Sequence, residues 1–162
     1  FENGFQRSDI DKAVELLRGG STLPDSQKSN IRGNPTTSLA DALTERFKWF
    51  KSPNDINEAI KLYRDILACY APAQSSHGTA LINLANAIFE KLMAQEEVHD
   101  IDECIKLYRD GLAIIPPSDP TRPRALANLA GAIQKHFHGV DDIYITDEVT
   151  RLYKESMTLC LP

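Results

Sequence analysis

Residues 84–88 read Leu-Ala-Asn-Ala-Ile, and residues 100–110 read Asp-Ile-Asp-Glu-Cys-Ile-Lys-Leu-Tyr-Arg-Asp. Similar phrases recur at a spacing of about 45 residues, a period typical of repeat proteins. The first phrase returns at 39–43 and 129–133, the second at 55–65, and degenerate copies of the second begin at Asp9 and Ile145. Each unit of a repeat protein buries its apolar face against its neighbours. The sequence therefore predicts a repeat architecture.

Both phrases have the apolar spacing of an α-helix. In the second phrase the apolar residues fall on one helical face, namely Ile101, Cys104, Ile105, Tyr108 and Leu112. The first phrase contains a recurring alanine, at Ala40, Ala85 and Ala130. A small side chain leaves room for a neighbouring helix, so we expect packing there rather than a cofactor site.

Start and stop signals divide the chain into helix pairs. Asn34-Pro35 and Asp119-Pro120 each place a capping residue before a proline that suits the first helical position. A D-x-x-E pattern, which can cap a helix, opens the second phrases at 55–58 and 100–103. We expect a leading helix at 8–18, and then pairs at 35–50 with 55–70, 79–94 with 100–115, and 120–137 with 145–160.

The expected organisation is a single repeat domain over residues 1–162. Its units are a partial repeat at 1–18 that has only the second helix, helix pairs at 35–70, 79–115 and 120–160, and an irregular, glycine-rich connector at 19–34. The chain begins with Phe1 rather than Met and opens inside a repeat. We therefore expect a fragment of a larger protein.

Composition and charge exclude several classes of partner. The sequence has 18 Lys and Arg against 23 Asp and Glu, a net charge of -5, with both signs mixed along the predicted helices. Nucleic-acid binding needs a basic stripe, so no nucleic acid is expected. No run approaches the roughly 20 apolar residues of a membrane span, so no membrane is expected either.

No catalytic motif, cofactor motif or paired CxxC is found in the sequence, so we expect neither an enzyme nor a bound cofactor. The nearest approach to a metal site is His136 and His138 with Asp141 and Asp142, but two histidines at i and i+2 point to different sides of a helix. A polar helix end explains them as well, and no metal is expected.

Other single residues have ordinary structural interpretations. Three cysteines without paired spacing argue against a disulfide framework. Cys104 replaces Ala59 of the preceding copy, which suits a buried thiol in a reducing, cytoplasmic (intracellular) compartment. Trp49, next to Phe47 and Phe50, is expected to pack between repeats, and an exposed anchor for a partner is the alternative.

The two phrases together resemble tetratricopeptide repeats, in the long variety found in kinesin light chains and many large fungal proteins. The resemblance rests on 84–88 followed by 100–112, on Pro116 closing the unit, and on 119–130 as the linker into the next repeat. It implies an all-α fold, an α-solenoid of antiparallel helix pairs wound into a right-handed superhelix. The standard repeat is about 34 residues long, so HEAT-like repeats remain the structural alternative.

The resemblance also indicates a place for a partner, because the first helices of this family line a concave groove. Register makes Asn83 and Asn128 equivalent to Ser38, and Asn86 equivalent to Asp41 and Gly131. An amide side chain donates and accepts hydrogen bonds, which suits a peptide backbone; alternatively, these asparagines brace turns or face water. The candidate partner-binding residues are Asn83, Asn86, Asn128, Thr79, Arg124, Glu90, Gln134 and Lys135, with Glu45 as a further charged position. Their charges are mixed, so a basic or amphipathic peptide is expected as much as an acidic one.

The resemblance implies a non-catalytic module that binds a protein or peptide through this groove, as part of a scaffold or signalling protein. Two alternatives stay open: the regulatory region of a larger enzyme or nucleotide-binding switch protein, and a structural spacer that self-associates. The oligomeric state cannot be predicted from these residues.

Overall fold

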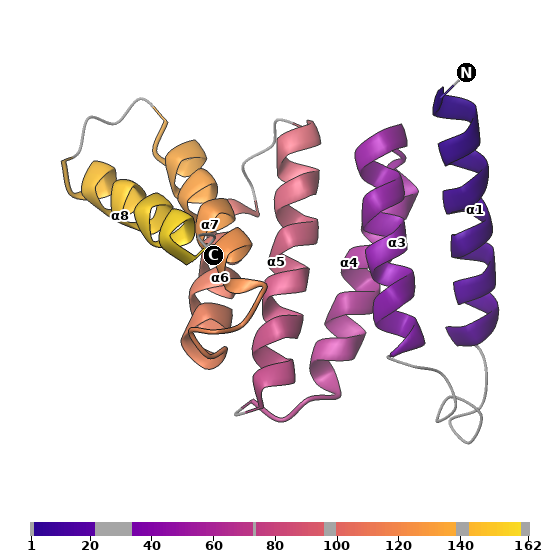
Figure 1. Ribbon diagram of the computed structural model, residues 1–162, viewed down its shortest axis with the longest axis horizontal. Helices are drawn as coiled ribbons and strands as arrows, with labels where there is room; N and C mark the ends of the chain where they lie inside the picture. Colours follow the sequence, from indigo (N-terminus) through magenta and orange to yellow (C-terminus); the bar gives the residue numbers. More distant parts are fainter. Residues whose placement is uncertain (1, 22–33, 73, 96–99, 139–142, 160–162) are drawn as a thin grey trace. The chain divides into compact units, whose positions relative to one another are not determined.

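The computed structural model describes residues 2–21, 34–72, 74–95, 100–138 and 143–159, and within them every regular element is an α-helix (Figure 1). The all-α expectation is confirmed for these residues. The chain divides into two compact units, 1–66 and 67–162, with the boundary in the last turn of α4. The helices are α1 (Glu2–Ser21), α3 (Pro35–Phe50), α4 (Pro53–Ala68), α5 (Ser75–Gln95), α6 (Ile101–Ile114), α7 (Arg122–His136) and α8 (Ile143–Leu159).

The helix boundaries differ from the prediction mainly at helix starts. Asn34 caps α3 as expected, its side chain accepting a hydrogen bond from the Thr36 amide at 3.0 Å. Helix α4 begins at Pro53 and not at 55. A proline is well suited to the first position of a helix, because it has no amide proton to leave unpaired there. Helix α7 begins at Arg122, because the Asp119 carboxylate accepts hydrogen bonds from the Thr121 amide and hydroxyl in a turn that precedes the helix.

Two further expectations were wrong. Helix α1 starts at Glu2 and continues through Gly19 to Ser21, so the irregular connector does not begin at 19; residues 22–33 lie outside the described residues. The D-x-x-E caps are absent as well. Asp55 lies inside the first turn of α4 and binds a guanidinium, and Asp100 precedes α6 without a side-chain cap.

The first unit is held by apolar packing and a partly buried ion pair. Helix α3 packs on α1, and it buries Leu43 and Phe47 almost completely. Arg46 donates two hydrogen bonds of 2.7 Å to Asp55 of α4 and one of 3.0 Å to Asp11 of α1. The hydrogen bonds that Arg46 donates to Asp55 are the largest cause of the raised pKa of Arg46. Arg46 therefore joins all three helices of this unit.

In the second unit each helix packs on the next, α5 on α6, α6 on α7 and α7 on α8, and α5 also contacts α7. The predicted packing residues Ala85 and Ala130 are fully buried. Glycines permit the closest approach: a Cβ at Gly111 would lie 2.7 Å from Ile82 Cγ1 and 2.9 Å from the Gly78 carbonyl oxygen. The backbones of α5 and α6 therefore touch where neither glycine has a side chain.

Arg122 ties the end of α6 to α7 and α8. Its Nη1 donates to the carbonyl oxygens of Leu112 at 2.9 Å and Ile115 at 3.4 Å, and its Nη2 reaches Glu155 of α8 at 3.4 Å. The last carbonyls of a helix have no partner within the helix. A side chain from the next helix supplies partners for this end of α6.

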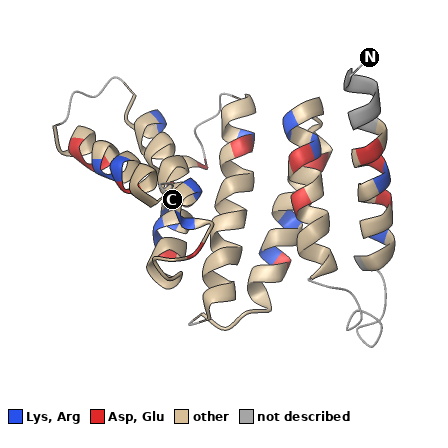
Figure 2. Cartoon of the chain, viewed as in Figure 1, with Lys and Arg blue, Asp and Glu red and all other residues tan. Residues whose placement is uncertain are grey.

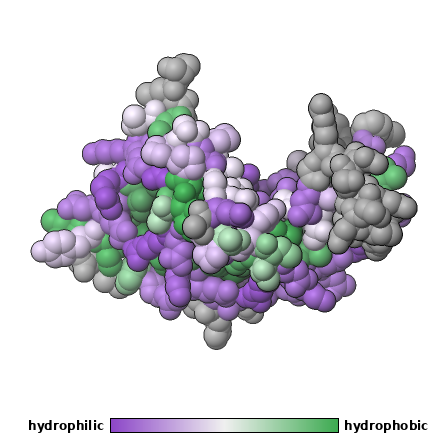
Figure 3. All heavy atoms as spheres, turned by 90° about the horizontal axis from the view of Figure 1, so that it is seen from below, coloured by the Kyte–Doolittle hydropathy of each residue, from purple (hydrophilic) through white to green (hydrophobic). Residues whose placement is uncertain are grey.

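The surface of the described residues mixes polar and apolar side chains. Figure 2 shows both acidic and basic residues on several of the helices, and the face in Figure 3 shows apolar areas interrupted by hydrophilic ones. Trp49 is 60% exposed, so the prediction that it packs was wrong; Phe47, two positions earlier, takes the buried place. None of the helices in the described ranges is long and apolar enough to cross a membrane.

The close contact between α5 and α6 predicts that two glycine-to-alanine substitutions change the free energy of unfolding in opposite directions. Gly111→Ala forces a Cβ against the α5 backbone, so we expect a loss of about 1–3 kcal/mol in the free energy of unfolding. Gly19→Ala in α1 meets nothing within 4 Å and should raise stability by up to about 1 kcal/mol through helix propensity. Urea unfolding followed by circular dichroism measures both. A stabilised Gly111→Ala variant would contradict the close contact.

Candidate partner-binding face

All eight predicted site residues lie on α5 and α7, which are neighbours in the second unit. Four form a stripe along α5 at helical spacing: Thr79, Asn83, Asn86 and Glu90. The matching stripe on α7 consists of Arg124, Asn128, Gly131 and Lys135, with Gln134 beside it. We call these two stripes the α5–α7 face. Arg124 and Gln134 are exposed, and the other members are half-buried.

A cluster of three polar side chains joins the two stripes. Asn86 Oδ1 accepts a hydrogen bond from the Tyr108 hydroxyl of α6 at 2.7 Å and another from Asn128 Nδ2 of α7 at 2.9 Å. Tyr108 is fully buried, and burial raises its pKa well above the usual range. The charges of Arg124 and Glu90 also act on this phenol, in opposite directions. The asparagines thus brace the helices, as the alternative interpretation held, while remaining half-exposed on the face.

Other members of the face differ in how they are held. The Thr79 hydroxyl donates a hydrogen bond to the Ser75 carbonyl oxygen, one turn earlier in α5, at 3.2 Å. This hydroxyl is therefore already bonded within its own helix. The Asn83 side chain makes no hydrogen bond to another residue that the structure describes. The structure brings the predicted residues Asn86 and Asn128 together in a hydrogen bond. The predicted cations Arg124 and Lys135 do not meet, because they lie at opposite ends of α7.

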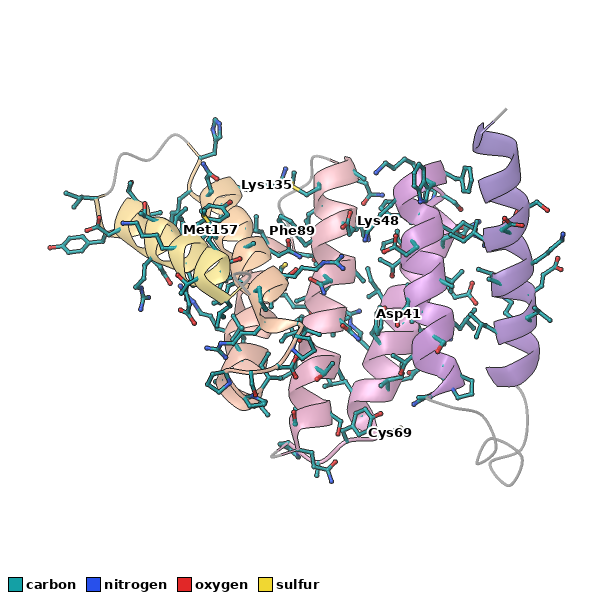
Figure 4. The ribbon with its side chains drawn as sticks, viewed as in Figure 1. Asp41, Lys48, Cys69, Phe89, Lys135 and Met157 are labelled. Carbon is teal, nitrogen blue, oxygen red and sulfur yellow. The ribbon has the colours of Figure 1, made fainter. Side chains whose placement is uncertain are left out.

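The equivalent stripe of the first unit lies on α3 and is acidic. Asp41, the counterpart of Asn86, accepts a hydrogen bond from the Tyr63 hydroxyl of α4 at 2.5 Å. Glu45 pairs with Lys48 at 2.6 Å, so part of its charge is neutralised within its own helix. Figure 4 labels Asp41 and Lys48 on α3. The tyrosine and its acceptor therefore recur in both units with the same spacing.

Sequence reasoning missed this tyrosine. Tyr63, Tyr108 and Tyr153 stand at one position of the repeat, and each follows Asp41, Asn86 or Gly131 by the same interval. Aligning the second phrases against the first would have revealed a recurring polar pair. It was overlooked because tyrosine fits an apolar stripe, and its hydroxyl was not counted as a donor.

Ion pairs between consecutive repeats also recur. Arg18 of α1 pairs with Glu58 of α4 at 2.5 Å in the first unit, and Arg109 of α6 pairs with Glu148 of α8 at 2.9 Å in the second. These pairs occupy matching positions of the repeat and join successive second helices. Exposed pairs of this kind contribute little energy, so their value here is as a marker of equivalent geometry.

Cysteine and histidine chemistry plays no visible part in the face. Cys104 is fully buried as predicted, lies 3.5 Å from the Ala85 carbonyl oxygen, and has its thiol pKa raised by burial to about 12. His136 lies 3.6 Å from Asp102 and stacks edge-on against Phe137. Asp141 and Asp142 lie outside the described residues, and among those described no metal-binding cluster of three or more ligands is found.

No family model, curated protein or solved structure matches this chain.

The cluster predicts unequal effects of two Tyr→Phe changes. Tyr108→Phe removes the buried donor to Asn86, and we expect a loss of about 0.5–1.5 kcal/mol in the free energy of unfolding. Tyr153→Phe is the matched control, because Tyr153 makes no hydrogen bond to a described residue; its effect should stay within about 0.5 kcal/mol. Urea unfolding measures both. Equal losses would show that the Tyr108 hydroxyl does not stabilise the cluster.

Alkaline pH should destabilise the protein through its buried phenols. The pKa values of Tyr63 and Tyr108 are raised in the fold, chiefly by burial, whereas unfolded tyrosine ionises near pH 10. Their stabilising effect is therefore complete below about pH 10 and is lost as the pH rises above that value. We expect the free energy of unfolding to fall as the pH rises from about 10 upward, and to fall less in Tyr108→Phe.

Tyr144→Phe is the control for this pH series, since Tyr144 is 82% exposed and should leave the alkaline decline unchanged. Denaturant unfolding at each pH gives the slope. Identical slopes for Tyr108→Phe and Tyr144→Phe would contradict the role of burial.

Proposed function

We propose that this chain is a protein-interaction module, and that the α5–α7 face binds a peptide or protein partner. The observation that carries the proposal is the cluster of Tyr108, Asn86 and Asn128, which fixes two half-exposed amides between neighbouring helices. Groups held in place before binding lose less conformational entropy when a partner arrives. Asn83, one turn from Asn86, adds an amide free to bond a peptide backbone.

Charge supports the same face. Helix α7 contains Arg122, Arg124 and Lys135 and no acidic residue, in a chain whose net charge is -5. Arg122 is engaged with the end of α6, which leaves Arg124 and Lys135 on the face. Complementary charge at such positions increases specificity and the rate of association. A partner with acidic side chains is therefore favoured over a basic one.

The architecture we propose with this function is a tetratricopeptide-like α-solenoid. Recurrence of the tyrosine pair and of the Arg–Glu pair at matching positions in each unit supports it. A buried Cys104 thiol supports a reducing intracellular compartment as the place of action.

Photo-crosslinking tests whether the face binds. With benzoylphenylalanine in place of Asn83, we expect a covalent adduct with a protein in cell extract. The same probe in place of Lys106, which is exposed on α6, serves as the control and should give none. An adduct from both positions, or from neither, would contradict a specific face.

Charge reversal then tests the energetics with the crosslinked partner. Arg124→Glu with Lys135→Glu should weaken affinity by about tenfold or more, while Lys106→Glu with Lys154→Glu, the same change of net charge on α6 and α8, should not. Calorimetry measures affinity and circular dichroism confirms that each variant is folded. Unchanged affinity of the α7 variant would overturn the assignment, as would an adduct formed only with a second copy of this chain.

A further inference from the structure

The recurring tyrosine has an acceptor in two copies of the repeat and lacks one in the third. Tyr63 donates to Asp41, and Tyr108 donates to Asn86. In the third copy the acceptor position is Gly131, which has no side chain to offer. Tyr153 accordingly makes no hydrogen bond to a described residue, and it is 37% exposed where Tyr108 is fully buried.

We call the surface at Gly131, bordered by Phe89 and the Tyr153 hydroxyl, the notch; the Phe89 ring lies so close that it must shift to admit another atom above Gly131. A Cβ placed at Gly131 would lie 3.8 Å from the Tyr153 hydroxyl and 3.3 Å from Phe89 Cζ. A carboxylate oxygen two bonds beyond such a Cβ would reach hydrogen-bonding distance of that hydroxyl. Phe89 extends from α5 towards α7 and forms one wall (Figure 4). The notch thus lies on the α5–α7 face, in the middle of the α7 stripe.

We propose that an aspartate or glutamate side chain of the bound partner enters the notch at Gly131 and accepts a hydrogen bond from the Tyr153 hydroxyl. The partner would supply the oxygen that Asp41 and Asn86 supply within the chain. This inference rests on the proposed function, and it adds the chemical class of the residue that is recognised.

Neighbouring charges select a carboxylate over an amide. Lys135 lies one helical turn beyond Gly131, and Arg124 lies on the same stripe towards the start of α7. Helix α7 contributes no acidic residue, so the two cations Arg124 and Lys135 outnumber Glu90 of α5, the one carboxylate among the residues of the α5–α7 face. A hydrogen bond to an ionised acceptor is also about twice as strong as one to a neutral acceptor. Both effects favour an acidic side chain.

The probes for the test are four fluorescent pools of random-sequence peptides whose central residue is fixed as Asp, Glu, Ala or Lys. We expect the Asp and Glu pools to bind the wild-type chain more tightly than the Ala and Lys pools in fluorescence polarisation. Gly131→Asn should abolish most of that preference, by about tenfold, because its own side chain occupies the Tyr153 hydroxyl. Gly131→Ala is the matched control, since it adds the same Cβ without an acceptor.

A nuclear magnetic resonance measurement on the wild-type chain tests the hydrogen bond at Tyr153 even where Gly131→Asn folds poorly. In protein labelled with ¹³C at tyrosine Cζ, the Tyr153 signal, assigned from Tyr153→Phe, should shift when the Asp pool is added and not when the Ala pool is added. The folded Gly131→Asn variant should show the shifted signal without peptide. Tyr153→Phe should lose the acidic preference with little change in stability.

The outcomes distinguish failure of the notch proposal from failure of the proposed α5–α7 binding face. Loss of acidic preference in Arg124→Glu with Lys135→Glu, but not in Gly131→Asn or Tyr153→Phe, would overturn the notch and leave the face in place. Absence of binding by every pool, or binding that none of these variants changes, would overturn both.

Discussion

The close contact between a first helix and its second helix is the constraint on which the second unit depends. Where Gly78 and Gly111 meet, the α5 and α6 backbones are too close to leave room for a methyl group on Gly111. At the fully buried Ala85, the Cys104 sulfur lies against the Ala85 carbonyl oxygen. Interiors packed at this density do not tolerate an added carbon without displacement. The Tyr108 hydroxyl reaches Asn86 across the same pair of helices, so the polar cluster and the contact between small residues hold one interface.

Helical periodicity in the sequence was sufficient to predict that the residues described by the structure are helical, and the approximate place of each helix among them. Helix starts were less accurate because local chemistry competes with the pattern. Asp55 and Asp119 both look like caps, yet one is bound by Arg46 from another helix and the other closes a turn on Thr121. Whether an aspartate caps its own helix depends on which cation or amide is nearest in space, which is a tertiary contact for Asp55 and a contact two residues along the chain for Asp119.

Register placed all the candidate residues on two neighbouring helices, but it did not reveal how they are held. Asn86 and Asn128 were selected for the donor and acceptor capacity of their amides, and the structure uses that capacity internally as well as leaving both half-exposed. Trp49 shows the opposite failure. Its aromatic surface suggested burial, but a helix has limited buried width, and Phe47 fills it. Residues at i and i+2 point to different sides of a helix, so the face of α3 that buries Phe47 leaves Trp49 exposed.

The Arg122 side chain has a consequence for how the second unit opens. One guanidinium connects the carbonyls at the end of α6, the start of α7 and a carboxylate of α8. Proteins open locally in contiguous cooperative units. We therefore expect the end of α6, the start of α7 and the Glu155 turn of α8 to exchange their amide hydrogens together, because one guanidinium connects all three.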